Sequence, residues 1–186
     1  MATTELVNPP LESTFSAGAR FVQWHESSLQ SVRTSLQVAL FTPADPQILA
    51  AIAAGLASIE NDSFVYLGKR ILLHATGVAH VPYLPQIGLT NTHIRLMGDA
   101  AVIIIVMCRP DKTEDTAAAT SIRDQMIFTK DVAALCGQRK LCCIQCDVIN
   151  YGMNRKYTNV IWSKTYEACD LELVADLLFG KQNHGH

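Results

Sequence analysis

The sequence predicts an α+β protein, in which N-terminal helices pack on a long antiparallel sheet. Apolar residues recur at helical spacing between residues 14 and 41, as expected for one amphipathic helix. Beyond residue 62 the apolar period shortens to about 2 and the residues become β-branched and aromatic, which favours strands to about residue 150. Helices followed by a sheet are typical of the α+β class.

The first helix is expected to end at Pro43, and a second begins at Asp45, whose carboxylate can accept hydrogen bonds from amides left unpaired in a first helical turn. It continues to about residue 60. Pro82 and Pro85 limit the next helix to about one turn. A last helix is expected over residues 167–179. The predicted strands are 63–67, 70–75, 89–97, 101–109, 121–130 and 140–150.

Residues 102–107 are apolar at every position, which predicts a central strand covered on both faces. The domain is therefore expected to span residues 13–150. Residues 1–12, with a Pro9-Pro10 pair and no apolar face, are expected to form a flexible lead. Residues 151–186 are expected to form an extension with one helix and a disordered tail.

Composition and net charge argue against several classes of protein function. The chain has 186 residues, of which 49% are hydrophobic and 17% are charged, a balance that argues against disorder and for an apolar surface covered by a partner. A net charge of -2 offers no basic footprint for nucleic acid. The longest apolar run, residues 100–108, is too short to span a membrane, and the N-terminus lacks a secretory pattern. A cytoplasmic or nuclear protein is expected.

Six cysteines are expected to be reduced thiols packed as small hydrophobic side chains. Cys143 and Cys146 have a metal-like spacing, but on a strand their side chains point to opposite faces. No second ligand pair with zinc spacing follows them. We therefore expect no metal site, and the sequence indicates no cofactor.

No phosphate-binding glycine loop, nucleophile elbow or His-Glu-x-x-His motif occurs. The remaining candidates for a binding or catalytic site are polar residues that are expected to point into the fold. If they share one concave face, they form either an internal ion pair or an anion pocket; if not, they are ordinary solvated positions. The residues expected to bind a ligand are His80, Arg95, Arg123 and Gln125, with Asp147 as their acidic partner.

The order of predicted elements resembles the cone of the nuclear transport factor 2-like superfamily. Within it, the string from His93 to Asp99 and the following Ala100 to Ile103 are similar to a strand, turn and strand of the association (hub) domain of calcium/calmodulin-dependent protein kinase II. The resemblance spans roughly residues 20–150. It implies a cone in which helices pack on a curved antiparallel sheet.

Two classes of function follow from this resemblance. The first is a non-catalytic association module, with or without a small-anion pocket. It would form a homodimer or ring, or pair with a related chain, through Ile103 and Ile105. The second is a small isomerase or cyclase acting on a carbonyl compound. Its base would be Asp147 or His80, and Tyr66 or Tyr83 would donate to the enolate oxygen. A heterodimeric transport cofactor is a third alternative.

Overall fold

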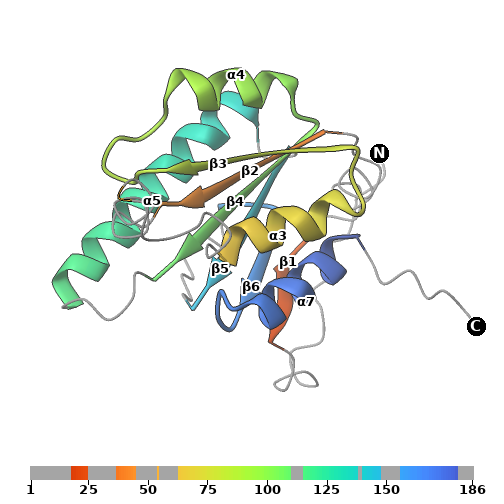
Figure 1. Ribbon diagram of the computed structural model, residues 1–186. Helices are drawn as coiled ribbons and strands as arrows, with labels where there is room; N and C mark the ends of the chain where they lie inside the picture. Colours follow the sequence, from red (N-terminus) through yellow and green to blue (C-terminus); the bar gives the residue numbers. More distant parts are fainter. Residues whose placement is uncertain are drawn as a thin grey trace, which may run out of the picture.

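The computed structural model describes residues 18–24, 37–44, 54, 63–109, 115–137, 140–147 and 156–179, with residues 115–120 described by their backbone alone. Within these residues, one six-stranded sheet is flanked by four helices (Figure 1). The strands are β1 (Ala19–Gln23), β2 (Gln37–Pro43), β3 (Gly77–Tyr83), β4 (Val102–Cys108), β5 (Leu141–Cys146) and β6 (Val160–Ser163). The helices are α3 (Ser63–Leu72), α4 (Asn91–Asp99), α5 (Asp115–Cys136) and α7 (Ala168–Phe179).

The strand order is β1-β6-β5-β4-β2-β3, and every neighbouring pair is parallel except β1 with β6. The chain passes from β2 outward to β3, then crosses back over β2 to β4 and continues to β5 and β6. The direction of winding therefore reverses between β2 and β4. We call this place the switch point of the sheet.

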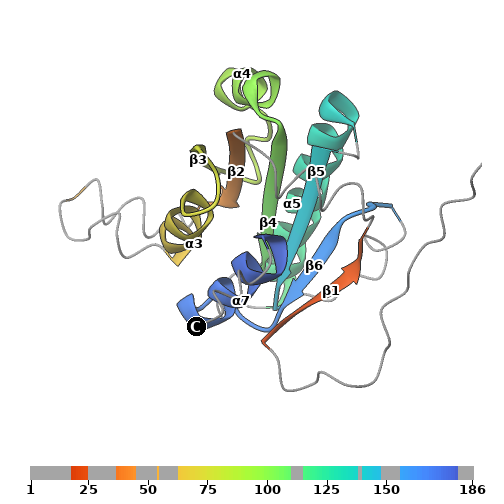
Figure 2. The same cartoon turned by 90° about the vertical axis from the view of Figure 1, so that its right-hand side faces the viewer.

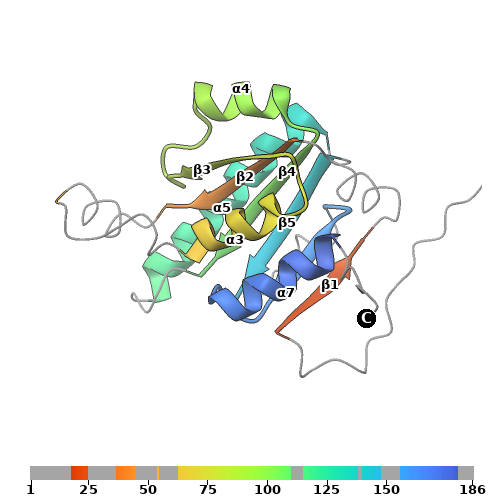
Figure 3. The same cartoon turned by 45° about the vertical axis from the view of Figure 1, so that its right-hand side comes forward.

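The helices form a layer on each face of the sheet. Helices α3 and α7 lie side by side on one face, while α5 lies on the other (Figures 2 and 3). Helix α4 joins α5 in covering that second face. This arrangement buries both sides of the parallel strands, which explains why β4 and β5 are apolar at almost every position.

Each face of the sheet has its own core. Val38, Ile104 and Ile144 pack toward α3 and α7, where Leu67 and Leu178 meet them. The alternate strand residues point the other way because side chains alternate along a strand. They pack with residues of α4 and α5; the buried members of this second core include Phe41, Ile103, Ile105, Cys143, Met97, Phe128 and Val132.

Three predicted elements are confirmed. The central strand over residues 101–109 is β4, the strand over 140–150 is β5 in its first part, and the helix over 167–179 is α7. Cys143 and Cys146 are buried on opposite faces, as strand alternation predicts. The predicted second helix, the flexible lead and the end of the tail lie outside the described residues.

Other predicted elements are wrong. Strands β1 and β2 occupy part of the predicted helix 14–41, and β3 replaces the broken helix. Helices α3, α4 and α5 stand where strands were predicted over 63–75, 89–97 and 121–130. In α3, Phe64, Leu67 and Ile71 share one buried face at helical spacing. Tertiary packing of that face outweighs the strand propensity of its aromatic and β-branched residues.

The mixture of helices with one sheet is confirmed, but the antiparallel cone is wrong. Four of the strand pairings within the described residues are parallel, and helices cover both faces. Ile103 and Ile105, the predicted interface residues, are fully buried beneath the chain's own helices. Their cover therefore requires no second copy. None of the helices within the described residues has the length and apolar content needed to cross a bilayer.

Candidate functional site

The parallel sheet splits at its carboxyl edge, at the switch point. Strand β2 pairs with β4 only as far as Phe41 and Ile105. Beyond that pair β2 remains bonded to β3, up to a hydrogen bond of 2.8 Å from the Ala44 amide to the Tyr83 carbonyl. Strand β4 instead continues with β5 to the pair Cys108 and Cys146. In open α/β sheets, ligands bind in the crevice outside the carboxyl ends of strands at such a reversal.

Gln125 of α5 closes the edge of β4 that β2 leaves open. Its Oε1 accepts a hydrogen bond of 3.0 Å from the Cys108 amide, and its Nε2 donates one of 2.9 Å to the Cys108 carbonyl. The Gln125 side chain thus bonds both backbone groups of one residue, as a neighbouring strand would. Since Gln125 is only 1% exposed, this pairing satisfies backbone groups that would otherwise be buried without partners.

Tyr83 ties β3 to β4 beneath the end of β2. Its hydroxyl donates a hydrogen bond of 2.9 Å to the Val106 carbonyl and lies 3.5 Å from Gln125 Oε1. Burial raises the pKa of Tyr83 well above its usual value, and the nearby thiols of Cys108, Cys143 and Cys146 add to this. The phenol therefore stays protonated and serves as a donor.

An aromatic cluster supports this tyrosine. We define it as Phe41, Tyr83, His93 and Phe128. The Tyr83 and Phe128 rings stack with centroids 3.9 Å apart, and Phe41 meets His93 edge-on at 5.0 Å. The His93 Nδ1 lies 2.8 Å from the Thr90 hydroxyl and accepts from the Thr90 amide, at the start of α4. The cluster fixes α4 and α5 on the strands that border the split.

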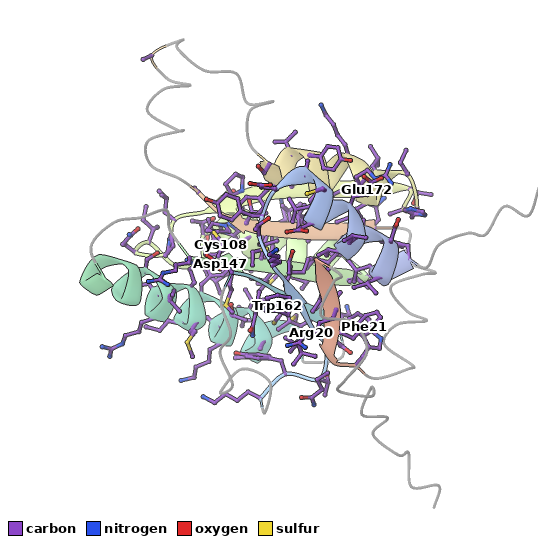
Figure 4. The ribbon with its side chains drawn as sticks, turned by 90° about the horizontal axis from the view of Figure 1, so that it is seen from below. Arg20, Phe21, Cys108, Asp147, Trp162 and Glu172 are labelled. Carbon is purple, nitrogen blue, oxygen red and sulfur yellow. The ribbon has the colours of Figure 1, made fainter. Side chains whose placement is uncertain are left out.

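Arg109 and Asp147 form the rim of this edge. They directly follow the paired residues Cys108 and Cys146, and both are exposed. Figure 4 labels Cys108 and Asp147 beside each other at the ends of β4 and β5. Asp147 has a φ of 54°, in the left-handed region, and its amide donates to the Ser163 carbonyl at 3.0 Å. Such backbone is uncommon for a residue other than glycine and is concentrated at functional sites.

We call this group the carboxyl-edge site. It has exposed polar residues at its rim and a buried polar floor, so it can offer a carboxylate, a guanidinium and backbone groups to a polar ligand. No group of three or more histidine, cysteine or acidic side chains placed to hold a metal ion occurs within the described residues. The carboxyl-edge site comprises Ala44, Tyr83, Cys108, Arg109, Gln125 and Asp147.

The structure brings together only some of the residues predicted from sequence. Tyr83 and Gln125 meet in the floor, and Asp147 lies at the rim. Arg95 and Arg123 are exposed, on α4 and on α5 respectively.

His80 and Tyr66 lie on the opposite face. The His80 Nε2 is 2.9 Å from the Thr42 hydroxyl, and the Tyr66 hydroxyl donates to Glu172 at 3.4 Å. Of the base and donor residues proposed for a carbonyl isomerase or cyclase, His80 and Tyr66 thus lie on this face, whereas Asp147 and Tyr83 belong to the carboxyl-edge site, where the buried Tyr83 hydroxyl donates to Val106.

Sequence reasoning missed Arg109 as a rim residue and missed the role of Gln125. The sequence does contain an indication of Arg109, because it is the first charged residue after the stretch that forms β4 and is apolar on both faces of the strand. Polar residues directly after buried parallel strands share one edge of the sheet. Without a parallel sheet in the prediction, this signal had no structural meaning.

The fold is similar to part of several solved glycoside-processing proteins. A β-glucosidase from Listeria innocua matches with a TM-score of 0.59 and 14% identity, over 87% of this chain and 23% of that one. A glycoside hydrolase family 3 β-N-acetylglucosaminidase from Paenibacillus matches with a TM-score of 0.58 and 12% identity, over 87% and 28%. The β-glucoside phosphorylase BglX matches at 0.55 and 12%, over 87% and 27%.

The chain thus spans about a quarter of the length of these structures, and the likeness shows the fold. No family model matches the sequence, and no curated protein matches it either. These findings correct the resemblance drawn from sequence. The resemblance to the nuclear transport factor 2-like hub is wrong, because the solved structures that share this fold are those of glycoside-processing proteins and the sheet is mainly parallel. The non-catalytic association module, which was inferred from that resemblance, falls with it.

Proposed function

We propose that this chain binds a sugar at the carboxyl-edge site. The observation that carries the proposal is the split of the sheet at the switch point, where β2 and β4 part beyond Phe41 and Ile105. That position is where open α/β sheets place their ligands. The buried bonds of Gln125 and Tyr83 keep the two halves in fixed positions, so the rim is preorganised for binding.

The chemistry of the rim suits a neutral polyol. A carboxylate such as Asp147 can accept hydrogen bonds from two neighbouring hydroxyls, and a guanidinium such as Arg109 can donate to ring and hydroxyl oxygens. Arg109 and Asp147 thus bring opposite charges to the ends of two adjacent strands. A sugar satisfies both groups, whereas a phosphate would face the Asp147 carboxylate.

The structural neighbours support a particular class of sugar. Their names describe enzymes acting on β-glucosides and β-N-acetylglucosaminides. We therefore propose β-linked glucose or N-acetylglucosamine units as the ligand of this chain. Cellobiose and N-acetylglucosamine are the probes that follow from this proposal.

The proposed role is recognition rather than hydrolysis by this chain alone. Glycoside hydrolysis ordinarily uses two carboxyl groups, about 5 to 10 Å apart. Within the described residues, Asp147 is the one carboxylate that directly follows a parallel strand. A second carboxylate would have to come from elsewhere.

Calorimetric titration of the full chain with cellobiose and with N-acetylglucosamine tests the proposal. We expect saturable binding to one of them, and Asp147→Asn and Arg109→Ala should each weaken it by about tenfold, or roughly 1.4 kcal/mol. The matched controls are Asp99→Asn and Arg95→Ala, which change exposed residues at the other edge of the sheet or on α4. Binding that survives both rim substitutions, or no binding by either sugar, would overturn the proposal.

A further inference from the structure

We propose that Cys108 and Cys146 form a reversible disulfide when the protein meets a peroxide. The two residues are paired in register on adjacent parallel strands, β4 and β5. Both side chains pack on the same face of the sheet, toward α3 and α7. This inference concerns the covalent state of the edge and does not depend on sugar binding.

The register of the sheet gives the two residues a backbone spacing that a disulfide can bridge. Neighbouring strands lie about 4.8 Å apart, and disulfides join residues whose Cα atoms are about 4.4 to 6.8 Å apart. Among the paired strand residues that the structure describes, Cys108 and Cys146 are the one pair in which both partners are cysteine. The other strand cysteines, Cys142 and Cys143, pair with Ile104, Ile105 and Val160.

The two cysteines differ in access, which assigns their roles. Cys108 is half-buried at the edge, whereas Cys146 is fully buried. Burial raises the pKa of the Cys146 thiol, so this group remains protonated at neutral pH. Cys108 is therefore the thiol that meets the oxidant, and Cys146 is the resolving thiol.

The reaction balances with one molecule of hydrogen peroxide. The Cys108 sulfur attacks one peroxide oxygen, the O–O bond breaks, and a sulfenic acid and one water result. The Cys146 sulfur then attacks the Cys108 sulfur. The S–O bond breaks, and the departing oxygen leaves as a second water with the Cys146 proton. Two electrons pass from the two sulfurs to the peroxide, and an external thiol reverses the step.

The disulfide would act directly on the carboxyl-edge site. The Cys108 backbone is held by Gln125, and Asp147 directly follows Cys146. A covalent bond between Cys108 and Cys146 restricts the motion of the two rim residues that follow them, Arg109 and Asp147. An effect on sugar affinity would rest on the proposed function, whereas formation of the bond would not.

Mass spectrometry of the full chain under graded hydrogen peroxide tests the inference. We expect the protein to lose the mass of two hydrogen atoms, with Cys108 and Cys146 in one cross-linked peptide, and dithiothreitol should restore the starting mass. Cys169 is exposed on α7 and serves as the internal control for unassisted oxidation. Its modification should follow, not precede, the cross-link.

Two variants keep the result interpretable. In Cys146→Ala the resolving thiol is absent, so Cys108 should accumulate as higher oxygen adducts at about ten times the wild-type level. Cys108→Ser should remove the cross-link while leaving Cys169 oxidation unchanged. Circular dichroism confirms that each variant is folded. Equal overoxidation of Cys108 in wild type and Cys146→Ala, or a peroxide-dependent loss of two hydrogen atoms that is as large in Cys108→Ser as in wild type, would overturn the inference.

Discussion

The two faces of the sheet hold their helices by different means. On the α4 and α5 face, buried rings stack on one another, and Gln125 and Tyr83 bond to the open backbone of β4. On the α3 and α7 face, the core is mainly aliphatic with interspersed thiols. A pair between Arg70 and Glu172, at 2.6 Å, links those two helices near the surface.

The difference shows on which face of the sheet buried backbone groups need polar side chains as partners. A sheet that splits at the switch point leaves backbone groups of β4 without a neighbouring strand, and Gln125 of α5 and Tyr83 of β3 supply side chains that bond to them. Contact of α3 and α7 with the sheet is mainly apolar, and such contact tolerates exchange of similar side chains. Substitutions on the two faces should therefore differ in their cost to the free energy of unfolding.

The largest expected effect is loss of the Phe128 ring. Phe128 is fully buried and contacts Tyr83, Phe41 and His93, so Phe128→Ala should lower the free energy of unfolding by about 4 kcal/mol. Phe64→Ala on the other face should cost about 3 kcal/mol, since Phe64 is 7% exposed. Urea unfolding measures both values. A larger loss for Phe64→Ala would reverse the comparison.

The next effect concerns the polar closure of the split. Gln125→Leu keeps the side-chain size but removes both hydrogen bonds that the side chain makes to the Cys108 amide and carbonyl, so it should cost about 3 kcal/mol. Thr42→Val on the opposite face removes one hydrogen bond to His80 and should cost about 1 kcal/mol. If the two substitutions cost the same in chemical denaturation, Gln125 has no special part in closing the sheet.

A smaller effect appears as pH dependence. Burial lowers the pKa of His93 in the folded protein below its value in the unfolded chain. Stability from the neutral imidazole is therefore present above about pH 6.5 and is lost as the pH falls toward the folded pKa. His93→Gln should reduce the difference in unfolding free energy between pH 7.5 and pH 5. An unchanged difference would show that His93 does not contribute to the acid sensitivity.

The smallest effect on stability is expected at the rim. Asp147→Asn preserves the size of the side chain and its tolerance of the left-handed region, so the free energy of unfolding should change by less than about 0.5 kcal/mol. Thermal unfolding monitored by circular dichroism measures this. A loss above 1 kcal/mol would mean that the Asp147 carboxylate stabilises the fold and is not reserved for a ligand.

Part of the fold could be predicted from sequence because some segments carry one unambiguous pattern. Residues 102–107 are apolar throughout and became the central strand β4, and residues 167–179 carry a helical face that became α7. Residues 121–130 satisfy two patterns at once. They alternate as a strand would, yet Gln125 and Phe128, together with Val132 just beyond them, also recur at helical spacing. Burial of this helical face against the sheet decides the outcome.

The site was less accessible to prediction than the fold. Gln125, Tyr83 and Asp147 were named as polar candidates, but their meeting depends on which strands are neighbours. Parallel pairing of β2 with β4 brings together segments separated by the whole of α3, β3 and α4. Local periodicity contains no information on that pairing, so the split and its closure by Gln125 emerged only from the structure.

Amide chemical-shift mapping of the full chain during titration with cellobiose and with N-acetylglucosamine tests whether the carboxyl-edge site binds sugar. If the sheet binds sugar where it splits, the amides that shift with saturation will include Ala44, Arg109 and Asp147 at the carboxyl edge. Gly98 and Lys140 at the opposite edge of the sheet will not move. Shifts confined to that opposite edge, or no shifts with either sugar, would contradict the account.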